Sequence, residues 1–245
     1  MNSLQVAGEG QPSPVEQKGV FEFFARSLVL EIKGFLETSF VDWPERICAV
    51  LFLPYCNFRC PYCHNHELVL SPGRFATLSW DFIRGRLKTL ADWLEGVCVT
   101  GGEPTLHPDL PDLLSGIKSL GFPVKLDTNG SRPQVLRFLV REGLVDFVAM
   151  DVKGPLETEQ YSRCAGVRVD LQPIRESIDF LMSGPVPYQF RTTVVPHIHS
   201  PEIMARLSRD LQDARQWARR EFRAGDVMDP EQCGRTSPDP GPAVH

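Results

Sequence analysis

The chain has 245 residues, 42% hydrophobic and 23% charged, which suits one globular domain with short tails. Its formal net charge of −5 disfavours a nucleic-acid partner, because such binding depends on basic surface. No stretch approaches the roughly 18 consecutive apolar residues of a membrane helix, and the N-terminus lacks the apolar core of a secretory signal. We therefore expect a cytoplasmic protein with no membrane partner.

Short apolar runs alternate along the chain with longer stretches of helical periodicity. The first run, residues 47–53, is continuously apolar, as expected of a strand buried on both faces. Further strands are predicted at residues 97–100, 123–127, 145–150 and 190–195. Helices are predicted at residues 79–94, with Ser79 as the N-cap, and at 108–120, 133–142, 174–181 and 201–211. Residues 215–222 are compatible with a sixth strand or with a helix.

Repeated strand–helix units predict an α/β fold with a parallel sheet and right-handed crossovers. Residues 27–227 are predicted to form the core domain, preceded by a disordered polar leader, residues 1–26, and followed by a flexible tail rich in Pro and Gly, residues 228–245. Chemistry in such sheets lies at the carboxyl ends of the strands. Four clusters follow successive predicted strands there: Cys56, then Gly101 to Glu103, then Asp127 to Asn129, then Asp151 and Lys153.

Three of the seven cysteines crowd into one short stretch at spacings of four and three, namely Cys56, Cys60 and Cys63. Thiolates are soft ligands that select zinc or iron–sulfur clusters. Three ligands from one loop leave a further metal position free, whereas a structural zinc site closes with a fourth protein ligand. A zinc knuckle completed by His64 or His66 stays open as the alternative at this point.

At this loop the sequence resembles the radical S-adenosylmethionine (SAM) superfamily, whose signature has three cysteines at this spacing and an aromatic residue, here Tyr62, before the last. The resemblance runs from about residue 31 to 230 and implies a partial (βα)6 barrel with parallel strands. It implies that the cysteines hold three irons of a [4Fe–4S] cluster and that SAM chelates the fourth. One-electron cleavage of the sulfonium would give methionine and a 5′-deoxyadenosyl radical, while the protein supplies position and exclusion of water.

The resemblance also assigns roles to the glycine-rich segment after the second predicted strand and to one arginine. Gly101, Gly102 and Glu103 match a motif that holds the methionyl amino group, although alone the segment could be an ordinary turn. Arg191 is expected against the carboxylate of SAM; the alternative is a strand-edge arginine that reaches solvent.

Two further clusters are associated by the resemblance with ions and with SAM. Asp127, Thr128 and Asp151 are associated with a monovalent cation, and Asp151 and Lys153 with the cofactor. Taken alone, the first cluster could be a plain turn and the Asp151–Lys153 pair a surface ion pair.

Several features resemble the activating enzymes of glycyl-radical enzymes, most closely the activating protein of anaerobic ribonucleoside-triphosphate reductase. His64-Asn65 follows the third cysteine, residues 40–44 precede the first strand, and residues 222–230 resemble the ending of that group. The resemblance implies hydrogen abstraction from a glycine Cα of a partner enzyme, a flavodoxin- or ferredoxin-type electron donor, and His64 and Tyr62 beside the cofactor. Glu45 is a departure, because the group usually has glycine there.

Two alternatives differ in class: a radical SAM enzyme acting on a small molecule, such as a deazapurine synthase, and a non-catalytic zinc-binding module. The other cysteines are interpreted as structural, with Cys48 and Cys98 as small hydrophobes in strands and Cys233 as an exposed thiol in the tail. His197 and His199 are interpreted as loop residues.

Overall fold

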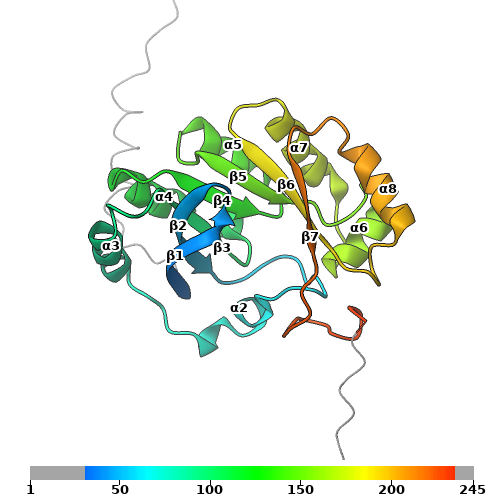
Figure 1. The fold of residues 1–245 in the computed structure, drawn as a ribbon, viewed down its shortest axis with the longest axis horizontal. Helices are drawn as coiled ribbons and strands as arrows, with labels where there is room; N and C mark the ends of the chain where they lie inside the picture. The colour runs from blue at the N-terminus through cyan, green and yellow to red at the C-terminus, as the bar shows by residue number, and fades with distance from the viewer. Residues whose placement is uncertain (1–30, 235–245) are drawn as a thin grey trace, which may run out of the picture.

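A curled sheet of seven strands, with helices around its outside, forms the centre of the molecule (Figure 1). The computed structural model describes residues 31–234, so the predicted leader, residues 1–26, lies outside the described part. The strands lie in chain order: β1 (Gly34–Trp43), β2 (Arg46–Leu53), β3 (Gly96–Gly101), β4 (Val124–Thr128), β5 (Phe147–Asp151), β6 (Tyr188–Val194) and β7 (Trp217–Glu221). β1 pairs with β2 in antiparallel fashion, and every later pair is parallel. This confirms the predicted partial barrel of parallel strands.

The helices occupy the connections between the parallel strands. In chain order they are α2 (His66–Leu70), α3 (Trp80–Thr89), α4 (Leu110–Ser119), α5 (Pro133–Arg141), α6 (Thr158–Ala165), α7 (Leu171–Met182) and α8 (Pro201–Asp210), with short 3₁₀ turns η2 (Pro72–Arg74) and η3 (Pro104–Leu106). Ser79 caps α3 as predicted, because its Oγ accepts a hydrogen bond from the amide of Phe82 at 3.2 Å.

Each predicted strand is present, and residues 215–222, left open between strand and helix, contain the strand β7. β7 is an edge strand whose last three residues are exposed, which explains its unusual charge. Three elements were not predicted: β1, α2 and α6. β1 is the opposite edge and α6 has a largely polar sequence, so neither carries the apolar run on which the prediction relied.

The turn between β1 and β2 consists of Pro44 and Glu45, between the paired residues Trp43 and Arg46. Glu45 has a φ of 63°, in the left-handed region that glycine adopts without a Cβ penalty. Proline followed by a residue of positive φ is the signature of a type II turn. The backbone therefore explains why glycine is usual here, and Glu45 holds a conformation that is costly for it.

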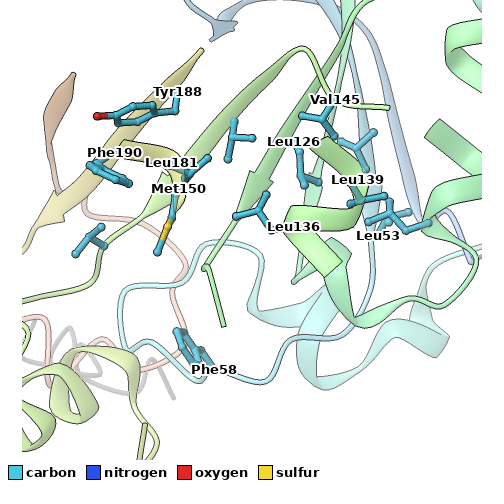
Figure 2. Packing of buried hydrophobic residues seen from close by; sticks show 14 of the residues in the cluster. Leu53, Phe58, Leu126, Leu136, Leu139, Val145, Met150, Leu181, Tyr188 and Phe190 are labelled. Carbon is cyan, nitrogen blue, oxygen red and sulfur yellow. The ribbon is translucent and has the colours of Figure 1, made fainter. Parts of the chain in front are cut away.

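The core lies between the sheet and its covering helices. Figure 2 shows part of it, including Leu126 of β4 and Leu136 and Leu139 of α5, all at most 1% exposed. A smaller buried cluster contains Cys48 and Cys98, both fully buried. The thiol of Cys98 differs from a plain hydrophobe, because it also lies 3.4 Å from Nζ of Lys125 and 3.7 Å from Oδ1 of Asp127. No helix within residues 31–234 has the length and apolar character needed to cross a bilayer.

Residues 228–234, predicted as the start of a flexible tail, pack against the loop that carries the three cysteines. The amides of Met228 and Asp229 donate hydrogen bonds to the carbonyls of Cys63 (3.2 Å) and Pro61 (2.8 Å). Cys233 is 5% exposed, so the prediction of an exposed thiol is wrong. The sequence could not show this, because the segment is held by backbone hydrogen bonds rather than by an apolar pattern.

Candidate active site

The three cysteines lie on the cysteine loop, residues 54–65, which connects β2 to α2 at the carboxyl end of the parallel strands. All three line one cavity of about 300 Å³. The same cavity is lined by every other residue that the sequence assigned to the site: Tyr62, His64, Gly101, Gly102, Glu103, Asp127, Thr128, Asp151, Lys153 and Arg191. The alignment at strand ends expected from the sequence is therefore found in the fold.

The cysteine loop is fixed by its own backbone and by a neighbouring helix. Arg59 donates from its amide to the carbonyl of Ala165 at 2.8 Å and from Nη1 to the carbonyl of Cys56 at 2.6 Å. Burial raises the pKa of Cys56 and of Cys60 to about 11, and it also raises that of Cys63. The free thiols are thus neutral near pH 7, and a metal that binds them must displace their protons.

The glycines after β3 lie where two loops touch. Gly101 has a φ of 114°, which side chains rarely tolerate. The amide of Gly102 donates to the carbonyl of Leu53 at 2.8 Å, and the amide of Glu103 donates to that of Tyr55 at 2.7 Å. A Cβ on Gly102 would overlap the carbonyl oxygen of Tyr55. The loops after β2 and β3 therefore require glycine for their own packing, and contact with a methionyl group stays a prediction.

Glu103 is a hydrogen-bonded acceptor rather than a free carboxylate. Its Oε1 accepts from the amide of Thr105 at 3.1 Å, from the hydroxyl of Thr105, and from the hydroxyl of Thr128 at 2.8 Å. Its Oε2 accepts from the amide of Asn129 at 2.6 Å. Burial raises the pKa of Glu103, although these hydrogen bonds oppose the rise. Glu103 thus ties the loop after β3 to the turn after β4, and Oε2 keeps capacity for a further donor.

A chain of buried charges crosses the strand ends beneath the loop. Lys125 pairs with Oδ1 of Asp127, and Nη1 of Arg191 lies 2.9 Å from Oδ2 of the same carboxylate. Nε of Arg191 lies 2.9 Å from Oδ1 of Asp151, whose Oδ2 lies 3.1 Å from Nζ of Lys153. The solvent-reaching alternative for Arg191 is wrong, since its side chain is 9% exposed. Asp151 and Lys153 line the cavity and do not form a surface pair.

Each charged side chain of this group stabilises the ionised state of its neighbours. Burial opposes the charge on each group, but Arg191 and Lys153 lower the pKa of Asp151 below its usual range. Burial likewise opposes charge on Lys153, and Asp151 outweighs it and raises the pKa of that ammonium. Paired charges of this kind keep their ionisation even in a low-dielectric site.

Two asparagines beside predicted site residues had been given no role. Nδ2 of Asn65 donates to the carbonyl of Gly101 at 3.0 Å. Nδ2 of Asn129 donates to Oδ1 of Asn57 at 2.8 Å and lies 3.8 Å from Sγ of Cys56. Each asparagine therefore links the cysteine loop to the end of another strand. Their position directly after the third cysteine and after β4 was the available signal.

His199 lies in a loop, as interpreted from the sequence, and contacts two residues that line the cavity, Lys153 and Tyr62. Its Nδ1 accepts from the amide of Val195 at 3.1 Å, so the proton resides on Nε2, which lies 2.8 Å from the carbonyl of Lys153. Burial lowers the pKa of His199, against a smaller opposing effect of these hydrogen bonds. The ring also meets Tyr62 edge-on, with centroids 6.1 Å apart. His199 thereby fixes the backbone at Lys153.

The two histidines considered as zinc ligands face the C-terminal segment instead. Nδ1 of His64 lies 3.2 Å from the carbonyl of Asp226, and its ring stacks on Phe222. Nε2 of His66 lies 3.2 Å from Oδ1 of Asp226, at an angle that does not make a hydrogen bond. Within residues 31–234 no three His, Cys, Asp or Glu side chains converge on one metal position. Cluster sulfurs need not converge so tightly, because each binds a different iron.

Comparison with known proteins decides between a zinc site and an iron–sulfur cluster. The family model described as "Radical SAM superfamily" matches residues 50–205, from β2 into α8. The chain belongs to the radical SAM superfamily. It is therefore an enzyme whose family implies a [4Fe–4S] cluster and SAM. The interpretation as a non-catalytic zinc module is wrong.

Curated radical SAM relatives differ in the reactions that their names give. A Methanocaldococcus jannaschii protein named "Putative glycyl-radical enzyme activating enzyme" is 33% identical over 207 residues, which cover 82% of this chain and 83% of that protein. A 7-carboxy-7-deazaguanine synthase of Neisseria meningitidis is 32% identical over 123 residues, covering 50% of this chain and 51% of that protein.

Solved structures support the radical SAM fold. Streptococcus suis SuiB aligns with a TM-score of 0.55 at 16% identity, covering 72% of this chain and 41% of SuiB. The structure "Native anSMEcpe with bound AdoMet" aligns with a TM-score of 0.52 at 18% identity. The alignment covers 69% of this chain and 49% of that protein. This chain thus spans less than half of those proteins, and the likeness concerns the fold alone.

The residues present fit a radical SAM cluster and its cofactor. Three free thiols at one cavity supply the soft donors that iron requires. The buried hydroxyl of Tyr62, in the signature's aromatic position, has no hydrogen-bond partner within the described chain. Arg191 and Lys153 bring positive charge to the same wall, as the carboxylate of SAM would require. The individual roles of these residues toward SAM stay predictions.

Proposed function

We propose that the chain activates a glycyl-radical enzyme of the anaerobic ribonucleoside-triphosphate reductase type by abstracting hydrogen from a glycine Cα of that partner. The observation that carries this proposal is the open side of the half-barrel. The edge strands β1 and β7 do not pair with each other in the described chain. A second cavity, of about 650 Å³, is lined by residues of β1 and β7 and shares Asp42, His64, Thr193 and Arg220 with the first.

The cofactor site in this proposal is made by the loops already described. Cys56, Cys60 and Cys63 would hold the cluster, while Lys153 and Arg191 would neutralise the carboxylate of SAM. When bound, the cluster and SAM together supply an organic radical through one-electron cleavage of the sulfonium. The residues of the chain bind and orient the cofactor, and the walls of the cavity shield a reactive intermediate from side reactions.

The second cavity, which we call the mouth, combines apolar surface with the charged residues Asp42, Arg220, Glu221 and Arg223. Phe40 and Val41 at the end of β1 are 74% and 78% exposed. Across from them, Arg220 and Arg223 are exposed and form no ion pair with another described residue. A protein loop with aliphatic and acidic side chains would satisfy both surfaces, as is usual at transient protein interfaces. The mouth thus supports a macromolecular substrate. The electron donor in this proposal is a flavodoxin- or ferredoxin-type protein.

A small carboxylate is the second candidate substrate, as in a deazaguanine synthase. Arg220 lines both cavities, so its guanidinium is in reach of a compound bound next to SAM. The deazaguanine synthase relatives favour this candidate, although the N. meningitidis alignment covers half of the chain.

The decisive experiment is electron paramagnetic resonance of the reduced protein with SAM and a candidate glycyl-radical enzyme. A glycyl doublet on the partner supports the proposal; its absence with every plausible partner, while a small carboxylate is consumed, contradicts it. Arg223→Glu should slow radical formation roughly tenfold by reversing charge at the mouth. Arg84→Glu is the matched control, because Arg84 pairs with Asp81 on the exposed face of α3; it should leave the rate unchanged.

A further inference from the structure

Every oxygen of the two carboxylates that the sequence associated with a monovalent cation is paired with a cationic side chain. Oδ1 of Asp127 pairs with Lys125 and its Oδ2 with Arg191; Oδ1 of Asp151 pairs with Arg191 and its Oδ2 with Lys153. Each oxygen thus already meets a cationic nitrogen of the chain. An alkali ion bound to any of these oxygens would lie beside a cationic side chain and be repelled by it.

The third expected ligand points to a different partner. Thr128 follows Asp127 directly on β4 and lines the same cavity. The hydroxyl of Thr128 donates to Oε1 of Glu103 at 2.8 Å and accepts from the amide of Gly130 at 3.1 Å. This hydroxyl is therefore bonded to the loop after β3 and to its own turn, and not to Asp127 or Asp151.

The charge balance of this buried region also disfavours an added cation. Two carboxylates, Asp127 and Asp151, face three cations, Lys125, Arg191 and Lys153. Around Asp127 water screens little of the repulsion that a fourth cation would meet, because the side chains of Lys125, Arg191 and Asp127 are 1%, 9% and 11% exposed. Lys153 and Asp151 lie nearer to solvent, at 15% and 35% exposed.

Lys125 is the member of this group that the sequence analysis overlooked. It lies two residues before Asp127 on β4, so both side chains share one face of the strand. Its Nζ donates to Asp127 and lies 3.4 Å from Sγ of Cys98, which is the paired residue on β3. A buried lysine is stable only when paired, and here the strand register supplies the carboxylate.

We propose that the ammonium of Lys125 is a built-in cation that replaces the monovalent metal ion, and that it positions Asp127 and through it Arg191 at the SAM site. Lys125 is a positioning residue in this account, since it does not line the cavity itself. The chain then needs neither sodium nor potassium to bind SAM. The inference rests on membership of the radical SAM superfamily and is independent of which partner or small molecule is the substrate.

The test compares potassium chloride with tetramethylammonium chloride at constant ionic strength, using protein with its cluster reconstituted anaerobically. The readouts are the dissociation constant for SAM and the thermal unfolding midpoint. Wild-type protein should show less than about a twofold difference in the dissociation constant and no shift in midpoint, because no ion binds. Lys125→Met keeps the length of the side chain but removes its charge. This variant should bind SAM at least about fivefold more tightly in potassium chloride than in tetramethylammonium chloride. A fivefold effect is at the lower end of the coupling typically found between two binding sites.

Lys118→Met is the matched control. Its ammonium lies 2.7 and 2.8 Å from the two carboxylate oxygens of Asp146, outside the cavity, so this variant should gain no potassium dependence. Tighter SAM binding or a higher midpoint of the wild-type protein in potassium overturns the proposal. So does a Lys125→Met protein that binds SAM equally in both salts, whatever its affinity. The wild-type comparison needs no variant, so poor folding of Lys125→Met leaves the proposal testable.

Discussion

Replacing Gly102 by alanine tests how the loops after β2 and β3 build the site. The added Cβ would overlap the carbonyl oxygen of Tyr55 and come within 2.5 Å of its carbonyl carbon and 3.2 Å of that of Pro54. These atoms belong to backbone, so no change of rotamer relieves the contact. The two loops must separate by about 1.6 Å to restore an ordinary van der Waals distance of 3.4 Å between the Cβ and that oxygen.

The expected cost follows from the hydrogen bonds that this separation breaks. The amide of Gly102 donates to Leu53 at 2.8 Å and that of Glu103 to Tyr55 at 2.7 Å. A buried backbone group left without a partner costs about 1–3 kcal/mol, and partial relaxation lowers the sum. We expect a loss of about 2–4 kcal/mol, which lowers the unfolding midpoint by roughly 5–15 °C in a domain of this size. Iron content should fall too, because Cys56 directly follows the displaced Tyr55.

Thermal unfolding and iron and sulfide analysis after anaerobic reconstitution measure both effects. Gly85→Ala is the control, since Gly85 is exposed on α3 and an added Cβ there meets nothing within 4 Å. Alanine favours a helix over glycine, so that variant should be unchanged or more stable by about 0.5–1 kcal/mol. If Gly102→Ala matched the wild-type protein in midpoint and iron content, our account of the loop contact would be refuted.

Three further predictions concern the cluster, the first turn and acid sensitivity. Cys60→Ala should abolish 5′-deoxyadenosine formation, measured chromatographically; retained turnover would exclude Cys60 as a ligand. Glu45→Gly should raise the stability by about 0.5–1 kcal/mol in urea titrations, because the φ of 63° strains glutamate and not glycine. Burial lowers the pKa of His199 and of His107, so the unfolded chain gains protons below about pH 6.5 that the folded chain does not bind. Stability should thus be full above that pH and decline as the pH falls, less steeply in His199→Gln; an equal slope would contradict this.

The sequence predicted five of the strands and the location of the site because both depend on local patterns. The apolar run of β2 is buried along most of its length, and the polar clusters after β2 to β5 follow from where each strand ends. Elements that lacked such a pattern were missed. α6 buries Tyr161, Cys164 and Ala165 within a polar sequence, and its place is decided by contact with the cysteine loop through Ala165 and Arg59.

The partners of the charged residues could not be predicted in the same way. The resemblance associated Asp127 with a monovalent cation, and a carboxylate alone does not show which cation it binds. The neighbouring strands decide: the parallel register sets Cys98 opposite Lys125 and Asp151 opposite Arg191. An i, i+2 rule applied to β4 would have placed Lys125 beside Asp127 from sequence. The pairing with Arg191 needs the sheet order, which no local pattern contains.

The site has two parts: a floor, which contains Glu103, Asp127 and Asp151 and is held by contacts within the chain, and the mouth, which has fewer such contacts. On the floor, Glu103, Asp127 and Asp151 are each bonded to groups of the chain, so the loops are organised before any ligand binds. At the mouth, Arg220 and Arg223 have no ion-pair partner in the described chain, and the strand edges are open. The floor contains the groups that any radical SAM reaction would need. Discrimination between a glycyl-radical partner and a small carboxylate must therefore depend on the mouth, so substitutions there should alter substrate choice while those on the floor alter SAM binding.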